Sequence, residues 1–170
     1  MSDFGFGARC RAARAEPTRH LLHALGDDDP EVRQAAAAAL ADRGEGRLAR
    51  AVLDAVAGDT QAVARLGDTR AVRPLMNLLN SREAEPRQVA ARALSALGRP
   101  AVEPLVRALR HRRPEVRATA AQALGEIGDA RALPALIRLL GRRDPAASAA
   151  AAGALGRMGD TAAIAPLIEA

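Results

Sequence analysis

The sequence predicts an all-α solenoid, in which pairs of helices stack as successive repeats. A first observation is the glycine that closes each Ala-rich segment, at Gly44, Gly67, Gly98, Gly128 and Gly159. A second is an aliphatic residue four positions before each glycine, at Leu40, Val63, Leu94, Leu124 and Leu155. Three of the four intervals between these glycines are 30 or 31 residues long. Such a period, with two helical patterns per unit, predicts repeats that bury their apolar faces only against neighbouring repeats.

Each repeat begins with a predicted helix A that is apolar on one face. In the third repeat, within residues 71–79, Val72, Leu75, Met76 and Leu79 fall at i, i+3, i+4 and i+7. The fourth and fifth repeats carry the same pattern at Val102, Leu105, Val106 and Leu109, and at Leu133, Leu136, Ile137 and Leu140. Pro74 and Pro104 are expected in the first turn of their helices, where a missing N–H is tolerated.

A predicted helix B follows each helix A after a tight turn. It is clearest over residues 114–127, and Gly128 is the expected residue just beyond its end. Its buried stripe consists of Val116, Ala120, Ala123, Leu124 and Ile127. Asp-Pro pairs at residues 29–30 and 144–145 supply an N-cap followed by proline at the first helical position, which predicts the start of a helix.

The second repeat and the C-terminus depart from this pattern. The second repeat is seven or eight residues short, which leaves a helix A over about residues 47–57 and a reduced helix B over residues 59–66. This predicts either a notch or kink in the solenoid or a tolerated deletion with no role. The sequence stops within a sixth helix A whose apolar residues Ile164, Leu167 and Ile168 have one side uncovered. We expect either a fragment of a longer chain or an edge that binds another molecule, including a second copy.

The composition bounds the domain organisation and the core. Residues 1–16 are expected to form a flexible basic segment, and residues 17–170 the repeat solenoid. Hydrophobic residues make up 49% of the chain but aromatic residues only 1%, so the core is predicted to consist of Leu, Val, Ile and Ala. Cys10 is the single cysteine, and no apolar run has the length of a signal peptide or a membrane span. A soluble, cytoplasmic protein is therefore expected.

Charge is distributed unevenly along the chain. The net charge is +5, and all 25 basic residues are arginines. Residues 21–68 carry five arginines against nine acids, whereas residues 69–113 carry ten arginines against three acids. An acidic first third is thus followed by a basic middle, which predicts a dipolar surface that attracts a charged partner.

The repeat segments resemble a known family. The residues that carry the resemblance are the segments 29–36, 114–129 and 159–168, which read DPEVRQAA, PEVRATAAQALGEIGD and GDTAAIAPLI. They are similar to the HEAT-like repeats of phycobilisome-lyase-type proteins. The resemblance covers roughly residues 18–170 and implies a right-handed α-α superhelix of about five and a half repeats. It also implies that the B helices line the concave face.

The predicted binding surface is this concave face together with a basic cluster. Positions opposite the buried stripe include Gln88, Arg92 and Ser95 in the third repeat, and Ala118, Gln122 and Gly125 in the fourth. A groove of small residues admits a helix or an extended segment of a partner, although the Ala and Gly content also has a purely compositional explanation. Arg87 and Arg117 flank the groove; together with Arg33 they alternatively form a structural ladder of arginines between layers.

Arg110, Arg112 and Arg113 form a basic cluster with His111 in the A–B turn of the fourth repeat. Guanidinium groups suit carboxylates and phosphates, so this cluster is expected either to attract an acidic partner or simply to be a solvated turn. The same arginines favour an alternative function, weak and sequence-nonspecific nucleic-acid binding through residues 69–113.

The function that the sequence favours is a non-catalytic scaffold or adaptor for a protein with an acidic surface or helix. A bilin-lyase-like chaperone is implied by the family resemblance alone. No catalytic residue, cofactor or metal is predicted: His20 and His23 could share a metal with Cys10 or Asp27, but that spacing is common by chance. Aspartates at 27–29 lack the remaining ligands of a calcium loop.

Overall fold

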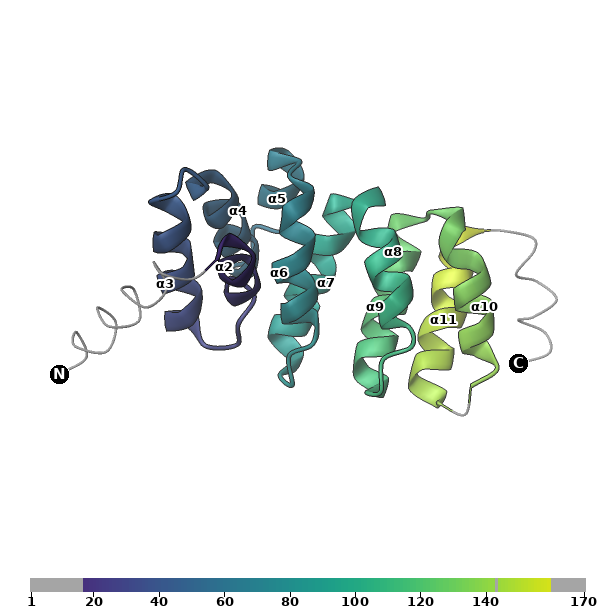
Figure 1. The fold of residues 1–170 in the computed structure, drawn as a ribbon. Coiled ribbons are helices and arrows are strands. Elements are labelled where there is room, and N and C mark those ends of the chain that lie inside the picture. Colours follow the sequence, from purple (N-terminus) through teal and green to yellow (C-terminus); the bar gives the residue numbers. More distant parts are fainter. Residues whose placement is uncertain (1–16, 143, 160–170) are drawn as a thin grey trace. The chain divides into compact units, whose positions relative to one another are not determined.

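The structure is a computed structural model that describes residues 17–142 and 144–159, and its described elements are all helical (Figure 1). The helices follow one another as A–B pairs, which confirms the predicted all-α solenoid. In order they are α2 (Thr18–Ala24), α3 (Pro30–Ala41), α4 (Gly46–Val56), α5 (Gln61–Leu66), η1 (Thr69–Ala71), α6 (Val72–Leu79), α7 (Ala84–Leu97), α8 (Arg99–Ala108), α9 (Pro114–Ile127), η2 (Ala130–Ala132), α10 (Leu133–Leu140) and α11 (Pro145–Met158).

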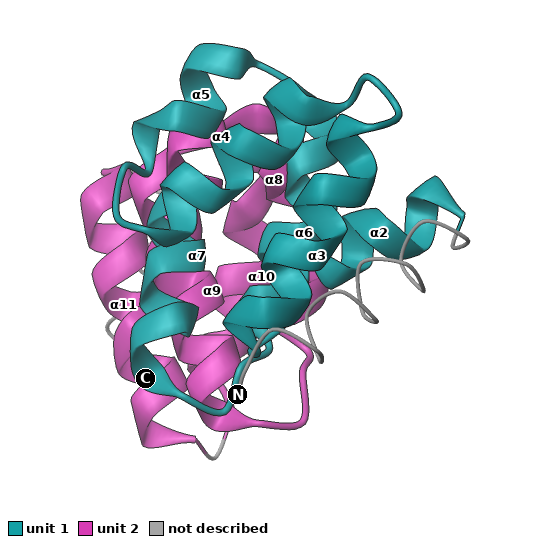
Figure 2. Cartoon of the chain, turned by 90° about the vertical axis from the view of Figure 1, so that its left-hand side faces the viewer, with its two compact units in different colours: residues 1–93 teal, residues 94–170 magenta. Residues whose placement is uncertain are grey.

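The chain divides into two compact units, residues 1–93 and residues 94–170, with the boundary inside α7 (Figure 2). The first unit contains the first two repeats and the beginning of the third. The second contains the fourth and fifth repeats. The expected flexible segment 1–16 and the expected uncovered helix near residues 160–170 lie outside the described residues.

The local signals at helix ends act largely as predicted. The Asp29 carboxylate accepts a hydrogen bond from the Glu31 N–H at 2.9 Å, and the Asp144 carboxylate accepts one from the Ala147 N–H at 3.3 Å. The expectation for Pro104 is wrong. Helix α8 begins at Arg99, so Pro104 lies inside the helix rather than in its first turn. The helix starts early because Pro100 already occupies a favourable position in its first turn.

The core of the second unit combines large leucines with many alanines. Leu105, Leu124 and Leu136 are fully buried. Helices α9 and α11 pack against each other, and Gly125 is a point of close approach between them. A Cβ placed on Gly125 would lie 2.6 Å from the Ala154 Cα and 2.7 Å from the Ala154 Cβ. Because these neighbours belong to the backbone and first carbon of α11, they cannot rotate away, and the absence of a side chain at Gly125 sets the spacing of the two layers.

We expect Gly125→Ala to lower the free energy of unfolding by about 2 kcal/mol, because the methyl group overpacks the α9–α11 contact. Gly153→Ala is the matched control: it also lies inside a helix, but its added Cβ would have ordinary contact only, 3.7 Å from Arg157 Nη1. Higher helix propensity should make Gly153→Ala more stable by about 1 kcal/mol. Urea denaturation of both variants checks this. Equal stabilisation by both changes would show that the layers are not held this closely.

In the first unit, the shortened second repeat changes which helices meet. Helix α5 has only six residues, and Val63 remains fully buried on it. Helix α2 of the first repeat packs directly on α6 of the third, as well as on α3. The Asn77 amide of α6 donates to the carbonyl oxygens of His23 at 3.1 Å and Gly26 at 2.9 Å. The expectation that each repeat packs only against its neighbours is therefore wrong at this place. The shortened repeat does not separate α2 from α6.

The short repeat also leaves a hollow. About 520 Å³ of open space lies between α4 and α5, lined by Arg47, Arg50 and Asp54 on one side and by Ala62, Arg65 and Leu66 on the other. This hollow occurs in the repeat for which a notch was predicted. Its lining carries both signs of charge, and one of its arginines, Arg65, forms an ion pair with Asp59.

Candidate partner-binding surface

The predicted B-helix residues are exposed at three positions. Gln88 and Arg92 lie one turn apart on α7, and both side chains are exposed. Gln122 is exposed on α9 in the second unit. These three side chains are available to a partner.

The small residues of the same predicted face are partly or fully buried within the protein. Gly125 is buried against Ala154, and Ala118 is half-buried. Ser95 is half-buried as well, and its hydroxyl group donates to the carbonyl oxygen of Ala123 at 3.4 Å. The expectation of an open groove of small side chains is therefore wrong for Gly125, because the adjacent B helix already packs there.

Arg117 is buried and holds the fourth and fifth repeats together. Its Nη1 donates to the carbonyl oxygens of His111 at 2.7 Å and Arg112 at 2.9 Å. Its Nε donates to Oδ2 of Asp144 at 2.9 Å, and its Nη2 bonds the same oxygen. The side chains of Arg117 and Asp144 are only 9% and 8% exposed. The hydrogen bonding between the Arg117 guanidinium group and the Asp144 carboxylate is the main reason why the pKa of Asp144 is below its usual value.

Arg87 is buried in the equivalent place of the third repeat. Its Nη1 donates to the carbonyl oxygens of Ser81 and Glu83, each at 3.0 Å, and of Arg82 at 3.3 Å. Its buried Nε finds no hydrogen-bond partner in the part of the chain that the structure describes.

Arg33 binds the carbonyl oxygens of Asp27 and Asp28 in the same way. All three arginines thus have a structural role, but each closes its own A–B turn instead of joining a ladder between layers. Of the three, Arg117 is the one shown to reach the next repeat, through Asp144. Placing Arg87 and Arg117 on the partner-binding surface therefore needs correction, since neither guanidinium group is exposed.

The basic cluster of the fourth repeat lies in the turn between α8 and α9. Arg110 and Arg112 are exposed, and Arg113 is half-buried. His111 is half-buried, and its Nδ1 accepts a hydrogen bond from the Arg113 N–H at 3.1 Å. Burial lowers the pKa of His111, and the positive charges of Arg113 and Arg112 lower it further. These effects favour the neutral form of His111, so the positive charge of this turn comes chiefly from its arginines.

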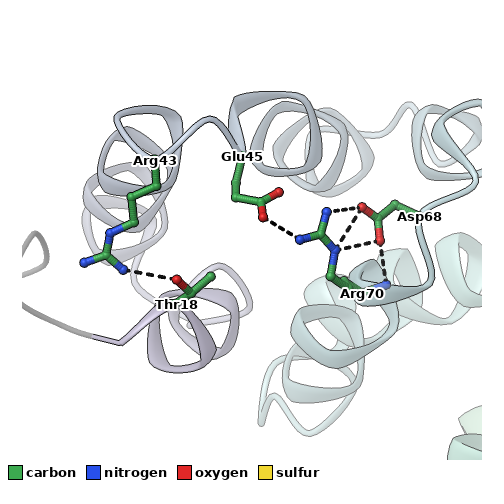
Figure 3. A network of polar contacts seen from close by, with 5 residues as sticks. All are labelled: Thr18, Arg43, Glu45, Asp68 and Arg70. Atoms are coloured by element: carbon green, nitrogen blue, oxygen red, sulfur yellow. Dashed lines mark hydrogen bonds and ion pairs between the residues drawn. The ribbon is translucent and has the colours of Figure 1, made fainter.

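Several exposed arginines elsewhere are neutralised by nearby carboxylates. Figure 3 shows Arg70 between Glu45 of the preceding repeat, at 2.5 Å, and Asp68, at 2.7 Å. The hydrogen bond from Arg70 is the main cause that lowers the pKa of Asp68. In the second unit, Arg131 pairs with Asp129 at 2.8 Å. These pairs remove arginines at 70 and 131 from the set that could attract an acidic partner.

Two further arginines were not singled out from the sequence. Arg138 and Arg142 line a groove between α8 and α10, together with Arg110 of the basic cluster. The signal was available, because the repeat period places Arg138 of the fifth repeat 31 residues after Arg107 of the fourth.

Metal and membrane sites are not indicated by the described residues. Within residues 17–142 and 144–159, no three His, Cys, Asp or Glu side chains are grouped so that they could hold a metal ion. None of the helices in these ranges is both long and apolar enough to cross a bilayer.

Paired helices that stack layer on layer define the class of α-solenoid repeat proteins. Three family models match the chain: HEAT repeats over residues 102–170, HEAT repeat over residues 19–42, and PBS lyase HEAT-like repeat over residues 86–111. The chain belongs to the HEAT-like repeat proteins.

Three similar solved structures are engineered proteins from the Northeast Structural Genomics Consortium. One is 25% identical with a TM-score of 0.48, over 95% of this chain and 75% of that chain. A second is 25% identical with a TM-score of 0.40, over 91% and 86%. A third is 23% identical with a TM-score of 0.38, over 94% and 56%. The comparison with curated proteins gives no match.

Proposed function

We propose that this chain is a non-catalytic, cytoplasmic interaction module that holds a partner protein bearing an acidic surface or helix. The contacts are assigned to the exposed B-helix residues Gln88, Arg92 and Gln122, and to the basic cluster of Arg110, Arg112 and Arg113. A solenoid supports this function because its stacked layers offer a long surface without needing a catalytic centre. HEAT repeats generally act in protein–protein interaction.

The observation that carries the proposal is the contrast between paired and unpaired exposed arginines. Arg70 and Arg131 have carboxylate partners within the chain. The guanidinium groups of Arg92, Arg110 and Arg112 have no hydrogen bond or ion pair within the described residues. Their charges are therefore available to carboxylates of another molecule, where guanidinium groups form strong paired hydrogen bonds.

Nucleic-acid binding is the second candidate, and the net charge of +7 over residues 69–113 favours it. The chain has no Trp or Tyr, and its two phenylalanines are Phe4 and Phe6. Stacking platforms for bases are thus missing from the repeats. Any complex with nucleic acid would rest on phosphate contacts and would weaken steeply with added salt.

We expect Arg92→Glu to weaken binding of a captured partner protein by about tenfold, because it reverses a charge in the contact. The partner is first captured from lysate with and without nuclease, and its dissociation constant is then measured by titration against the wild type and the variant. Arg50→Glu serves as the control, since Arg50 is exposed on α4, a helix that carries none of the proposed contacts. Loss of every captured protein after nuclease treatment would favour the nucleic-acid function. A nuclease-resistant partner that binds Arg92→Glu as tightly as wild type would contradict the assigned B-helix contacts.

A further inference from the structure

A groove of about 430 Å³ lies between the two A helices of the second unit, α8 and α10. Its floor and walls are aliphatic. Leu109 and Leu139 are 3% and 2% exposed and form the floor, and half-buried Val106 and Ala135 form the walls. The volume is within the range of sites that bind small molecules or short peptide segments.

Three arginines surround this apolar floor. Arg110 follows the end of α8, Arg138 lies on α10, and Arg142 follows the end of α10. All three side chains are exposed. None of their guanidinium groups has a hydrogen bond or ion pair within the described residues, and no described acidic side chain lines the groove.

The rim therefore differs from other surfaces of the same unit. At the opposite end of α10, Arg131 is neutralised by Asp129, which also lies 3.6 Å from Arg99. At the groove, three positive charges converge and no described acidic side chain lines the surface between them; Asp144, which feels the charge of Arg142, is paired with Arg117. Apolar surface bordered by uncompensated charge of one sign is complementary to an amphipathic ligand of the opposite sign.

We propose that this groove binds a short acidic segment of a partner protein. Aliphatic side chains of the segment enter the groove and pack on the surface formed by Leu109 and Leu139. The Asp or Glu carboxylates beside them pair with Arg110, Arg138 and Arg142. The inference rests on the proposed interaction function, but it assigns a separate contact on the A-helix side of the second unit. A helix with leucines at i, i+3 or i+4, and i+7 has the matching pattern of anchors.

The aliphatic floor favours a protein segment over nucleic acid. Phosphates would satisfy the arginines, but sugars and bases would leave the leucine floor without an apolar partner. Guanidinium groups bind carboxylates through two parallel hydrogen bonds. Leucine side chains of the bound segment are stabilised by leaving water for the aliphatic surface of the groove. Both parts of the groove are thus used by one acidic, aliphatic segment.

The test uses the full chain and a fluorescein-labelled, helix-forming peptide of about 14 residues, with leucines on one face and glutamates beside them. Fluorescence anisotropy gives the dissociation constant. Two control peptides carry lysine in place of each glutamate, or serine in place of each leucine. The glutamate–leucine peptide should bind at least about tenfold more tightly than either control, because each control removes one half of the complementarity.

Variants locate the contact. Arg138→Glu and Arg142→Glu should each weaken peptide binding by about tenfold, and Ala135→Leu, which fills the groove without changing charge, by about fivefold. Arg50→Glu is the matched control, an equal charge reversal at an exposed residue that does not line the groove, and it should change binding less than twofold. Thermal unfolding of each variant verifies that it is folded. Methyl NMR spectra of the wild type should show the signals of Leu109 and Leu139 shifting as peptide is added.

Three results would overturn the groove assignment. One is absence of binding by the glutamate–leucine peptide. Another is peptide binding that responds to Arg92→Glu and is insensitive to Arg138→Glu, which would leave the B-helix function intact and remove the groove. The third is a single-stranded oligonucleotide that binds more tightly than the peptide and loses affinity in Arg138→Glu, which would assign the groove to nucleic acid.

Discussion

Arg117→Met is expected to lower the free energy of unfolding by about 3 kcal/mol. Hydrogen bonds from a charged group contribute about 1.5–3 kcal/mol each, and Arg117 donates to two turn carbonyls as well as to Asp144. The methionine fills a similar volume but donates nothing. The hydrogen bonds to the carbonyl oxygens of His111 and Arg112 and to Oδ2 of Asp144 are then lost. Urea denaturation at pH 7 measures the loss.

Two further variants separate the parts of this effect. Arg92→Met removes an exposed arginine whose guanidinium group has no partner among the described residues, so we expect a change within about 0.5 kcal/mol. Asp144→Asn retains an oxygen that can cap α11 at the Ala147 N–H but removes the negative charge. The double variant Arg117→Met/Asp144→Asn should be more stable than Arg117→Met alone, because it has no buried carboxylate that lacks its arginine partner.

The pH dependence gives an independent signature of the same ion pair. The pKa of Asp144 is lowered in the folded protein, chiefly by the hydrogen bond from Arg117. The stabilisation is therefore fully present above the unfolded-state pKa of about 4, and it is lost as the pH falls through the lower folded-state value. The stability difference between wild type and Arg117→Met should be constant from about pH 5 to 7 and should shrink on further acidification. A difference that grows in acid would contradict the assigned pairing.

The repeat architecture could be predicted because its signals are local. A glycine with φ of +69° at Gly128 ends α9, and a proline begins the same helix. Leu124 is fully buried, as expected for the aliphatic residue that recurs four positions before the closing glycine of each repeat. Each of these features depends on neighbours within one helix, which a sequence displays directly.

The places where the sequence failed depend on contacts between repeats. Arg117 projects from a helix that is periodic and Ala-rich, and nothing adjacent in sequence shows that Asp144, 27 residues later, approaches it. Gly125 was expected on an open face because the projection of a single helix omits the neighbouring helix α11. The repeat period shows that Arg138 recurs after Arg107, but it does not show a groove, since Arg110 and Arg142 are brought together only when α8 and α10 stack.

Gly26→Ala is expected to lower the free energy of unfolding by about 3 kcal/mol through the contact between α2 and α6. A Cβ at Gly26 would lie 1.9 Å from the carbonyl oxygen of Pro74 and 2.7 Å from its carbonyl carbon. These atoms are backbone, so α2 must move away from α6, and overpacking of this kind costs about 1–3 kcal/mol or more. The cause is steric, because Gly26 is absent from the glycines with positive φ. Gly141→Ala is the matched control, as its Cβ would meet no atom within 4 Å.

Asn77→Ala provides the second half of a double-mutant cycle at the same contact. It removes the hydrogen bonds to the carbonyl oxygens of His23 and Gly26 without adding volume, and should cost about 1–2 kcal/mol. If Gly26→Ala already separates α2 from α6, those bonds are broken before Asn77 is changed. The double variant should then be no less stable than Gly26→Ala alone, whereas additive losses would mean that the two residues act at independent contacts. Hydrogen exchange should show faster exchange at the amides of residues 21–26 in both single variants, since these amides lie in or directly after α2, the helix that is released.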